Sequence, residues 1–478
     1  MFHGREEELA RLAELWKKPV ASLVTCRGRR RIGKSTLVAE FAKRSGARFL
    51  SFEGRPPRPG ISNAAQLEAF AERYAVLFGG PVPLFRNWTE AFHHLAAAVR
   101  DTWRTVILLD EISWMGGAAP DFPGDLKTAW DVEFKSHPKL VLVLCGSVSA
   151  WISDNILHGT GFAGRRSLDL VLGELPLADC VKFWGKAAAR VSAGEILDVL
   201  SVTGGVPRYL EELDPSLSAD ENIRRMAFLP GGILHDDLER IFGDVFGRSA
   251  TARRALLSAL ADGPQSAEDL ARKAGKTSNG HLSRTLEELA EAGFIAADSG
   301  LNPATGRPAG IIRYRIRDNY ARFYLRCIAP RLEAIDAGTF RFHSREQLPG
   351  WEILLGVQFE ALVLNHAAEF LPPLGLDRAL VLSAAPWRQS PGTRRRGCQI
   401  DLLLQTRRAA MIVEIKRRRE IGREIISETE QKADALQIKK GLTLRTALVY
   451  AGHLSPGVEA DGYFDAIVPA SAVLRGPQ

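Results

Sequence analysis

The stretch Gly28-Arg29-Arg30-Arg31-Ile32-Gly33-Lys34-Ser35 decides the fold of the N-terminal part of this chain. It matches the pattern G-x-x-x-x-G-K-[ST] in full, between an apolar run at 20–26 and a helical pattern that begins at 36. The two glycines allow the backbone to wrap tightly, so that its N–H groups and the positive end of the helix dipole face phosphate oxygens. We therefore expect a strand, a phosphate-binding loop and a helix in this order.

The loop residues have expected roles in binding ATP. Lys34 would reach the β- and γ-phosphates, and the Ser35 hydroxyl would ligate Mg²⁺. The expected nucleotide-binding set of this segment consists of Gly28, Ile32, Gly33, Lys34, Ser35 and Thr36. ATP and Mg²⁺ are therefore the cofactors that the sequence predicts.

Further apolar runs at 47–52, 105–109 and 140–145 alternate with helical patterns. This alternation favours a parallel sheet with helices on both faces. Asp110 and Glu111 follow the run at 105–109. Such a pair is often only a solvated turn, but beside a phosphate loop we expect Asp110 to hold Mg²⁺ through water and Glu111 to polarise the attacking water. Ser147 is either a sensor of the γ-phosphate or a helix N-cap.

These motifs resemble, in kind and order, those of the AAA+ and STAND P-loop ATPases, and in particular the archaeal-type ATPase family. Residues 2–9 resemble the segment that flanks adenine there, and residues 204–210 resemble the Gly-x-Pro element, in which Pro207 would close over adenine. The resemblance covers roughly residues 1–240 and implies ATP hydrolysis. It leaves open whether an arginine of 164–166 or Arg208 senses phosphate, or whether these arginines form surface salt bridges.

The middle of the chain predicts a winged helix. Helical patterns at 251–261, 266–274 and 278–293 precede two short strands around a Gly/Pro-rich loop at 300–310. His281 and Arg284 would lie on the exposed face of the recognition helix, with Arg307 and Arg313 on the wing. One interpretation is that this face reads DNA. The alternative is that the wing packs on the ATPase as an inter-domain module.

A second group of charged residues stands near the C-terminus. Asp401 lies in the apolar run 400–404, and Glu414 and Lys416 end the run that starts at 409. Strand alternation puts Glu414 and Lys416 on one face, and a hairpin would bring Asp401 beside Glu414. Close carboxylates are costly unless a divalent cation lies between them, and a lysine beside them can stabilise transition-state charge. Glu360, on the apolar helix at 353–370, would complete the ligand set.

This spacing resembles the PD-(D/E)xK nuclease superfamily over about 350–455, with Gln399-Ile400 standing before Asp401 in place of a Pro-Asp dipeptide. The resemblance implies Mg²⁺-dependent DNA cleavage, with Glu360, Asp401 and Glu414 as metal ligands and Lys416 as a further catalytic residue. A surface hairpin with ordinary salt bridges, or a nuclease fold without activity, is the alternative. A regulatory STAND-type ATPase that binds DNA or protein without cutting is the alternative for the whole chain.

Composition and length predict the class of protein and the number of its domains. The 478 residues are 46% hydrophobic and 25% charged, which is typical of a globular protein of about three domains. We predict an α/β chain with a parallel-sheet P-loop ATPase and helical lid at 1–245, a winged helix at 246–340, and an α/β restriction-endonuclease-like domain at 345–478.

The charge is concentrated in one window. The net charge is +7, and residues 388–423 hold eleven basic and three acidic residues, a net +8. A cationic rim of this kind would hold DNA phosphates near the metal. Five scattered cysteines, the lack of a signal-peptide core and the lack of an apolar membrane span predict a cytoplasmic protein without a membrane partner. DNA is the expected partner, and self-association is left open.

Overall fold

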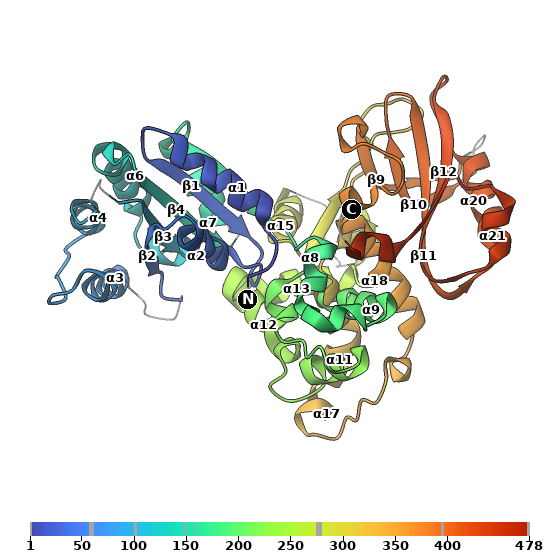
Figure 1. Ribbon diagram of the computed structural model, residues 1–478, viewed down its shortest axis with the longest axis horizontal. Helices are drawn as coiled ribbons and strands as arrows, with labels where there is room; N and C mark the ends of the chain where they lie inside the picture. The colour runs from blue at the N-terminus through green and yellow to red at the C-terminus, as the bar shows by residue number, and fades with distance from the viewer. Residues whose placement is uncertain are drawn as a thin grey trace. The chain divides into compact units, whose positions relative to one another are not determined.

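The computed structural model describes most of the chain, namely residues 2–56, 62–99, 103–147, 150–157, 159–273, 280–392 and 396–475 (Figure 1). It divides into two compact units. The first contains Met1–Glu174, Arg240–Ala250 and Glu291–Gly293, and the second contains Leu175–Glu239, Thr251–Ala290 and Phe294–Gln478. The helices after residue 174, which we expected to form the ATPase lid, thus belong to the second unit. The domain boundaries at 245 and 340–345 stay predictions.

The first unit is built on a five-stranded parallel sheet in the order β2-β3-β4-β1-β5. Its strands are β1 Ser22–Gly28, β2 Arg48–Glu53, β3 Thr105–Asp110, β4 Leu140–Ser147 and β5 Arg166–Leu172. The predicted parallel sheet is therefore confirmed, and four of its strands coincide with the predicted apolar runs. Strand β5 was not predicted, because Arg166, Ser167 and Asp169 interrupt its apolar pattern at the sheet edge.

Helices cover both faces of this sheet, because alternate side chains of its central strands are apolar on both sides. One face shares a continuous apolar core with α3 (Asn63–Phe78), α4 (Trp88–Ala97) and α6 (Phe122–Val132). Helix α2 (Lys34–Arg44) packs against the central strands through buried Leu37, Val38 and Phe41. The shorter helices are α1 Glu6–Glu14, α5 Ile112–Gly116 and α7 Ala150–Ile152. The strand, loop and helix order expected around residue 28 is confirmed.

The second unit begins with a group of helices that includes α9 Ala193–Thr203 and α11 Ala219–Ala227. Helix α12 (Ile233–Phe246) is divided between the two units at residue 240. A winged helix follows. It consists of helices α13 Ala250–Ala259, α14 Ala267–Lys273 and α15 Gly280–Glu291, and of strands β6 Gln265–Ser266, β7 Ile295–Asp298 and β8 Arg313–Ile316 in the order β6-β8-β7. The predicted start of α14 is confirmed, because the Asp269 N–H donates to Ser266 Oγ at 3.1 Å. Part of the predicted helix at 278–293 lies outside the described residues.

The wing packs on the C-terminal sheet. Leu301 N donates to Ser383 Oγ at 3.1 Å, and Gln405 Nε2 donates to Leu301 O at 2.6 Å. Lys439 N donates to Pro303 O at 2.8 Å. These hydrogen bonds join the wing to the C-terminal domain, a contact that was not predicted, and DNA reading by the winged helix stays a prediction.

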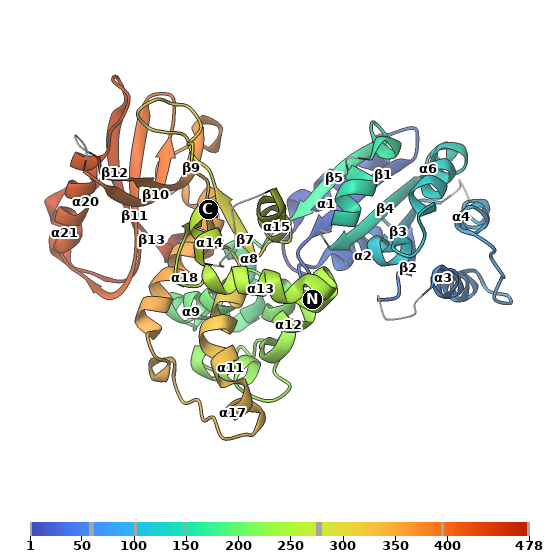
Figure 2. The ribbon, with the colours of Figure 1, turned by 180° about the vertical axis from the view of Figure 1, so that it is seen from behind.

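The C-terminal domain is a five-stranded mixed sheet in the order β13-β12-β11-β10-β9 (Figure 2). Its strands are β9 Ser383–Gln389, β10 Cys398–Gln405, β11 Ala409–Ile421, β12 Thr443–Leu454 and β13 Ala466–Pro469. Helix α18 (Trp351–Asn365) packs along β11, and α20 (Glu424–Ala435) and α21 (Pro456–Asp461) share an apolar core with β12. The helix predicted at 353–370 ends earlier, at Asn365, and a short helix α19 (Ala367–Phe370) follows it.

Two further observations concern the chain as a whole. Within the described residues, none of the helices combines the length and the apolar composition that crossing a bilayer requires. The five cysteines are free.

Candidate functional sites

The phosphate loop joins β1 to α2 in a conformation that depends on its glycines. Gly28 and Gly33 have φ values of 156° and 85°, and a Cβ at Gly28 would lie 2.5 Å from the Leu172 carbonyl oxygen. Helix α2 starts after Gly33 without a side-chain cap, so its first N–H groups are available to an anion. Ile32 is buried, and Thr36 is exposed in the first turn of α2. This backbone fits a phosphate group, as expected.

Lys34 lies along this loop. Its side chain is buried, and Nζ donates to the carbonyl oxygens of Gly28 and Arg29, each at 3.2 Å. Arg5 links the loop to the residue after β5, because its guanidinium donates to Ile32 O at 3.3 Å and to Gly173 O at 2.6 Å. The lysine charge is thus placed over the loop.

The sheet edge beside the loop carries carboxylates. Ser35 Oγ donates to the Asp110 carboxylate, which brings together the two groups expected to hold Mg²⁺, directly and through water. Glu111, with φ 45°, directs a mostly buried side chain from the turn after β3. Burial raises the pKa of Glu111, and in the described chain its Oε2 has no hydrogen-bond partner. These residues fit a nucleotide with Mg²⁺.

One acidic residue at this edge was missed. Glu53 ends β2 directly opposite Asp110 in the ladder. Burial, together with the negative charges of Asp110 and Glu111, raises the pKa of Glu53. The signal was present in the sequence, since Glu53 ends the predicted strand at 47–52 as Asp110 ends the next strand of the sheet.

The remaining nucleotide-site predictions have different outcomes. Ser147 lies at the same sheet edge, opposite Gly28, and its N–H bonds the Glu111 carboxylate. The residues that would follow it as a capped helix, 148 and 149, lie outside the described residues. Arg165 pairs with Asp131 at 2.8 Å, which is the salt-bridge alternative. Pro207 begins α10 (Pro207–Leu210) and Arg208 pairs with Glu212 there. Both lie in the second unit, so the role of Pro207 stays a prediction.

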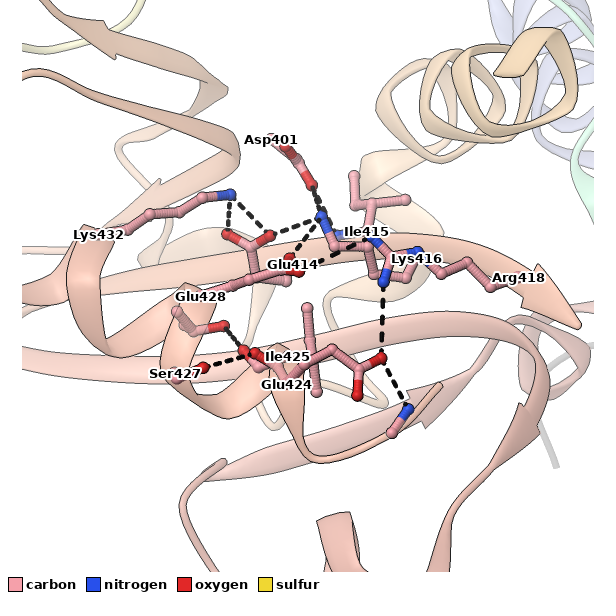
Figure 3. A network of polar contacts seen from close by, with 12 residues as sticks. Asp401, Glu414, Ile415, Lys416, Arg418, Glu424, Ile425, Ser427, Glu428 and Lys432 are labelled. Atoms are coloured by element: carbon pink, nitrogen blue, oxygen red, sulfur yellow. Dashed lines mark hydrogen bonds and ion pairs between the residues drawn. The ribbon is translucent and has the colours of Figure 1, made fainter. Parts of the chain in front are cut away.

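A second candidate site lies on the C-terminal sheet, where β10 and β11 form the predicted hairpin. Leu402 faces Val413 in the ladder, and Asp401 and Glu414 come next on the two strands. Asp401 Oδ2 accepts from the Ile415 N–H at 3.0 Å. Lys416 Nζ lies 3.1 Å from Glu414 Oε2 and 3.8 Å from Asp401 Oδ2 (Figure 3). The three residues are therefore brought together, as predicted.

Lys432 of α20 also belongs to this cluster and was missed (Figure 3). Its Nζ donates to both oxygens of the fully buried Glu414 carboxylate, at 2.6 and 2.8 Å. The pattern of α20 could have indicated this position, because Lys432 follows buried Ile425 and Thr429 at helical spacing.

The carboxylates of the cluster influence one another. Burial raises the pKa of Asp401, and the charge of Glu414 adds to this rise. Burial raises the pKa of Glu360 to about 7, and the charge of Asp401 is the next cause. Burial opposes the charged form of Lys416, but Asp401 and Glu414 outweigh it and raise its pKa.

The metal-binding fit of this cluster is incomplete. Among the described residues, no three carboxylate, histidine or cysteine side chains lie close enough to hold one metal ion. Lys432 and Lys416 also contact the Glu414 oxygens. The assignment of Glu360, Asp401 and Glu414 as metal ligands therefore stays a prediction.

The cationic window 388–423 is partly neutralised. Arg417 pairs with buried Asp198, and Arg423 pairs with Asp461 at 2.5 Å. Arg394 and Arg395 lie outside the described residues. Within the described chain, the exposed arginines of the window that form no ion pair are Arg388, Arg396, Arg407, Arg408 and Arg419. The window therefore exposes fewer unpaired arginines than its net charge of +8 suggests, and its role as a rim around a metal site stays a prediction.

This chain is similar in part to proteins that are already known. Residues 250–296 match the family model of the helix-turn-helix domain, which confirms the winged helix, and His281 and Arg284 are exposed on α15 as expected. The uncharacterized protein MJECL04 of Methanocaldococcus jannaschii is 25% identical over 424 residues, which cover 87% of each chain.

Solved structures of similar fold include two archaeal proteins. The Walker-type ATPase PABY2304 of Pyrococcus abyssi is 19% identical, with 68% of this chain and 96% of that chain covered and a TM-score of 0.46. The ORC2 protein of Aeropyrum pernix is 14% identical, with 70% and 96% covered and a TM-score of 0.43.

Proposed function

We propose that this protein binds and hydrolyses ATP at the loop between β1 and α2. The observation that carries the proposal is the contact of Ser35 with Asp110 beside buried Lys34 and Glu111. Lys34 supplies charge to the phosphates, and Glu111 is placed to accept a proton from the attacking water. Bound Mg²⁺, held by Ser35 and Asp110, would offset the phosphate charge.

The replacement Lys34→Ala tests this proposal. We expect ATP turnover to fall to background, because the loop loses the positive charge that Lys34 would place on the β- and γ-phosphates. Lys43→Ala, an exposed lysine of the same helix, is the matched control and should hydrolyse ATP normally. Turnover in Lys34→Ala equal to that of the control would refute the assignment.

We further propose that the second unit binds DNA and that the cluster of Asp401, Glu414 and Lys416 cleaves it with Mg²⁺. The helix-turn-helix match, the exposed arginines and the convergence of two carboxylates on Lys416 support this proposal. Nucleotide state would control DNA engagement. A specific observation favours binding without cleavage, because Lys432 takes both oxygens of Glu414.

An assay on duplex, branched and single-stranded DNA with Mg²⁺ or Mn²⁺, with and without ATP, separates these alternatives. Asp401→Asn should abolish cleavage by the native chain, because it removes the charge of one proposed metal ligand. Asp434→Asn, an exposed residue of α20, is the control. DNA binding without any metal-dependent cleavage by the native chain would favour the non-cutting function.

A further inference from the structure

A cavity of about 340 Å³ lies within the second unit, between the winged helix and the C-terminal domain. Its walls come from strand β8 and the loop between β7 and β8 on one side, and from β9, β10 and α18 on the other. Neither domain forms this cavity alone. Its position therefore depends on how the wing is docked.

The docking of the wing is specific. The three hydrogen bonds made by Leu301 and Pro303 hold its backbone to the C-terminal domain. Gly300 also lies close to β9, because a Cβ there would be 3.2 Å from Ala385 Cβ. On the wing side, Asp298 of β7 and Arg315 of β8 form a buried ion pair at 2.9 Å, and both residues line the cavity. The cavity is thus formed by ordered elements.

The lining combines an aromatic ring with cationic and amide groups. Trp387 packs on the apolar core around Ile400 and also lines the cavity. Within the described chain, its Nε1 is buried without a hydrogen-bond partner. Arg313, Arg388 and Gln399 line the same cavity, and Arg388 lies opposite Gln399 in the β9–β10 ladder. An aromatic face with arginines beside it is the usual chemistry for an unpaired base and its phosphate.

We propose that this cavity binds one unpaired nucleotide of a DNA strand, with the base against Trp387 and the phosphate toward Arg313 and Arg388. The volume is at the lower end of ligand pockets, roughly 300–1,000 Å³, and admits a nucleotide but not a base-paired duplex. Glu360 lines the cavity, so a nucleotide there would lie next to the cluster of Asp401 and Lys416. The inference rests on the proposed DNA binding, and it assigns a strand with a single-stranded end as the preferred substrate.

Binding measured without divalent metal and without ATP tests the proposal independently of catalysis. The full chain is titrated with a fluorescent blunt duplex and with the same duplex carrying a short single-stranded extension. Stacking of one base on an aromatic ring predicts about tenfold tighter binding of the extended duplex. Trp387→Leu should remove this preference and leave the affinity for the blunt duplex unchanged. Arg388→Ala should also remove the preference, and it should weaken the blunt duplex only as much as the loss of another exposed arginine of the window does. Trp387→Phe, which keeps an aromatic face, should retain most of the preference.

The control is Arg419→Ala, an exposed arginine of β11 outside the cavity. It should weaken both DNAs equally, because it acts only on the general attraction of phosphates. The proposal is overturned if the extension adds no affinity, if Arg419→Ala removes the preference as Arg388→Ala does, or if only an RNA extension is preferred. Competition by a free deoxynucleoside monophosphate without any preference for the extension would also overturn it. If Asp401→Asn loses cleavage but keeps the preference for the extended duplex, the result bears on the proposed catalysis and leaves the proposed nucleotide-binding cavity unaffected.

Discussion

At the residue scale, the buried carboxylate of Glu414 is a group whose charge requires partners within the C-terminal domain. A carboxylate that is fully removed from water is costly unless it is paired and hydrogen-bonded. Lys432 gives it two hydrogen bonds, and Lys416 lies 3.1 Å from one of its oxygens. The charges in this cluster therefore stabilise the domain only as a set.

Removal of one lysine should lower the stability of the C-terminal domain. We expect Lys432→Met to destabilise β11 by about 3 kcal/mol, because it leaves a buried charge with one remaining partner. Hydrogen exchange of the β11 amides measures this loss. Lys440→Met, at an exposed lysine, is the control and should change little. The double variant Lys432→Met/Glu414→Gln should be less destabilised than the two single changes added together, and strict additivity would contradict the pairing.

At the element scale, β11 is longer than its sequence indicates. The apolar run ends near Ile415, but the strand continues to Ile421 through charged residues. Parallel pairing with β12 holds this charged part of β11 in the sheet, and the ladder has a bulge between Arg417 and Glu420. Gly452 of β12, with φ 125°, makes room for the bulge, because a Cβ there would lie in contact with the Arg418 carbonyl. The glycine is needed for both conformation and space.

The variant Gly452→Ala tests this requirement. We expect it to lower the stability of the C-terminal sheet by about 3 kcal/mol or more, since it combines a left-handed backbone with a backbone clash. Gly356→Ala, in helix α18 with open space at the Cβ position, is the matched control. That change should instead stabilise by roughly 0.5–1 kcal/mol. Thermal unfolding of both variants gives the comparison, and equal behaviour would be evidence against the bulge.

At the scale of the whole molecule, one ion-pair network joins the helical part of the second unit to the C-terminal sheet. Asp198 of α9 pairs with Arg417 of β11 and with Arg345, and Arg345 also pairs with Asp220 at 2.6 Å. Burial raises the pKa of Asp198 against the pull of these arginines. Arg417 follows Lys416 directly, and α9 leads to the Pro207 segment predicted to contact adenine. We expect this network to couple the Pro207 segment to β11, beside the proposed cleavage site.

Replacement of Asp198 by alanine tests that coupling. We expect DNA affinity of the native chain to differ between its ATP and ADP states by roughly fivefold or more, a usual coupling between two sites. Asp198→Ala should abolish this difference while basal ATP turnover stays normal. The control Asp214→Ala removes an exposed pair with Arg225 and should keep the difference. Equal coupling in both variants would show that the network is only structural.

Local patterns determined much of this protein. The phosphate loop, four strands around it, the winged helix and the hairpin of Asp401 and Glu414 all follow from short-range periodicity, glycine placement and strand alternation. Such features depend on neighbours within a few residues, so they are readable in the sequence. The edge strand β5 and the charged end of β11 were not readable, because pairing with distant strands holds them.

Only the tertiary structure decided the contacts between segments far apart in the chain. Three contacts are of this kind. Lys432 contacts Glu414, and the wing docks on β9 and β10. Arg417 pairs with Asp198, so its charge is no longer available to the cationic window. Charge counts treat every arginine alike, whereas folding pairs some of them with buried acids and leaves others exposed. The reason is that burial and partner choice are set by how separate elements pack, and no local pattern records that packing.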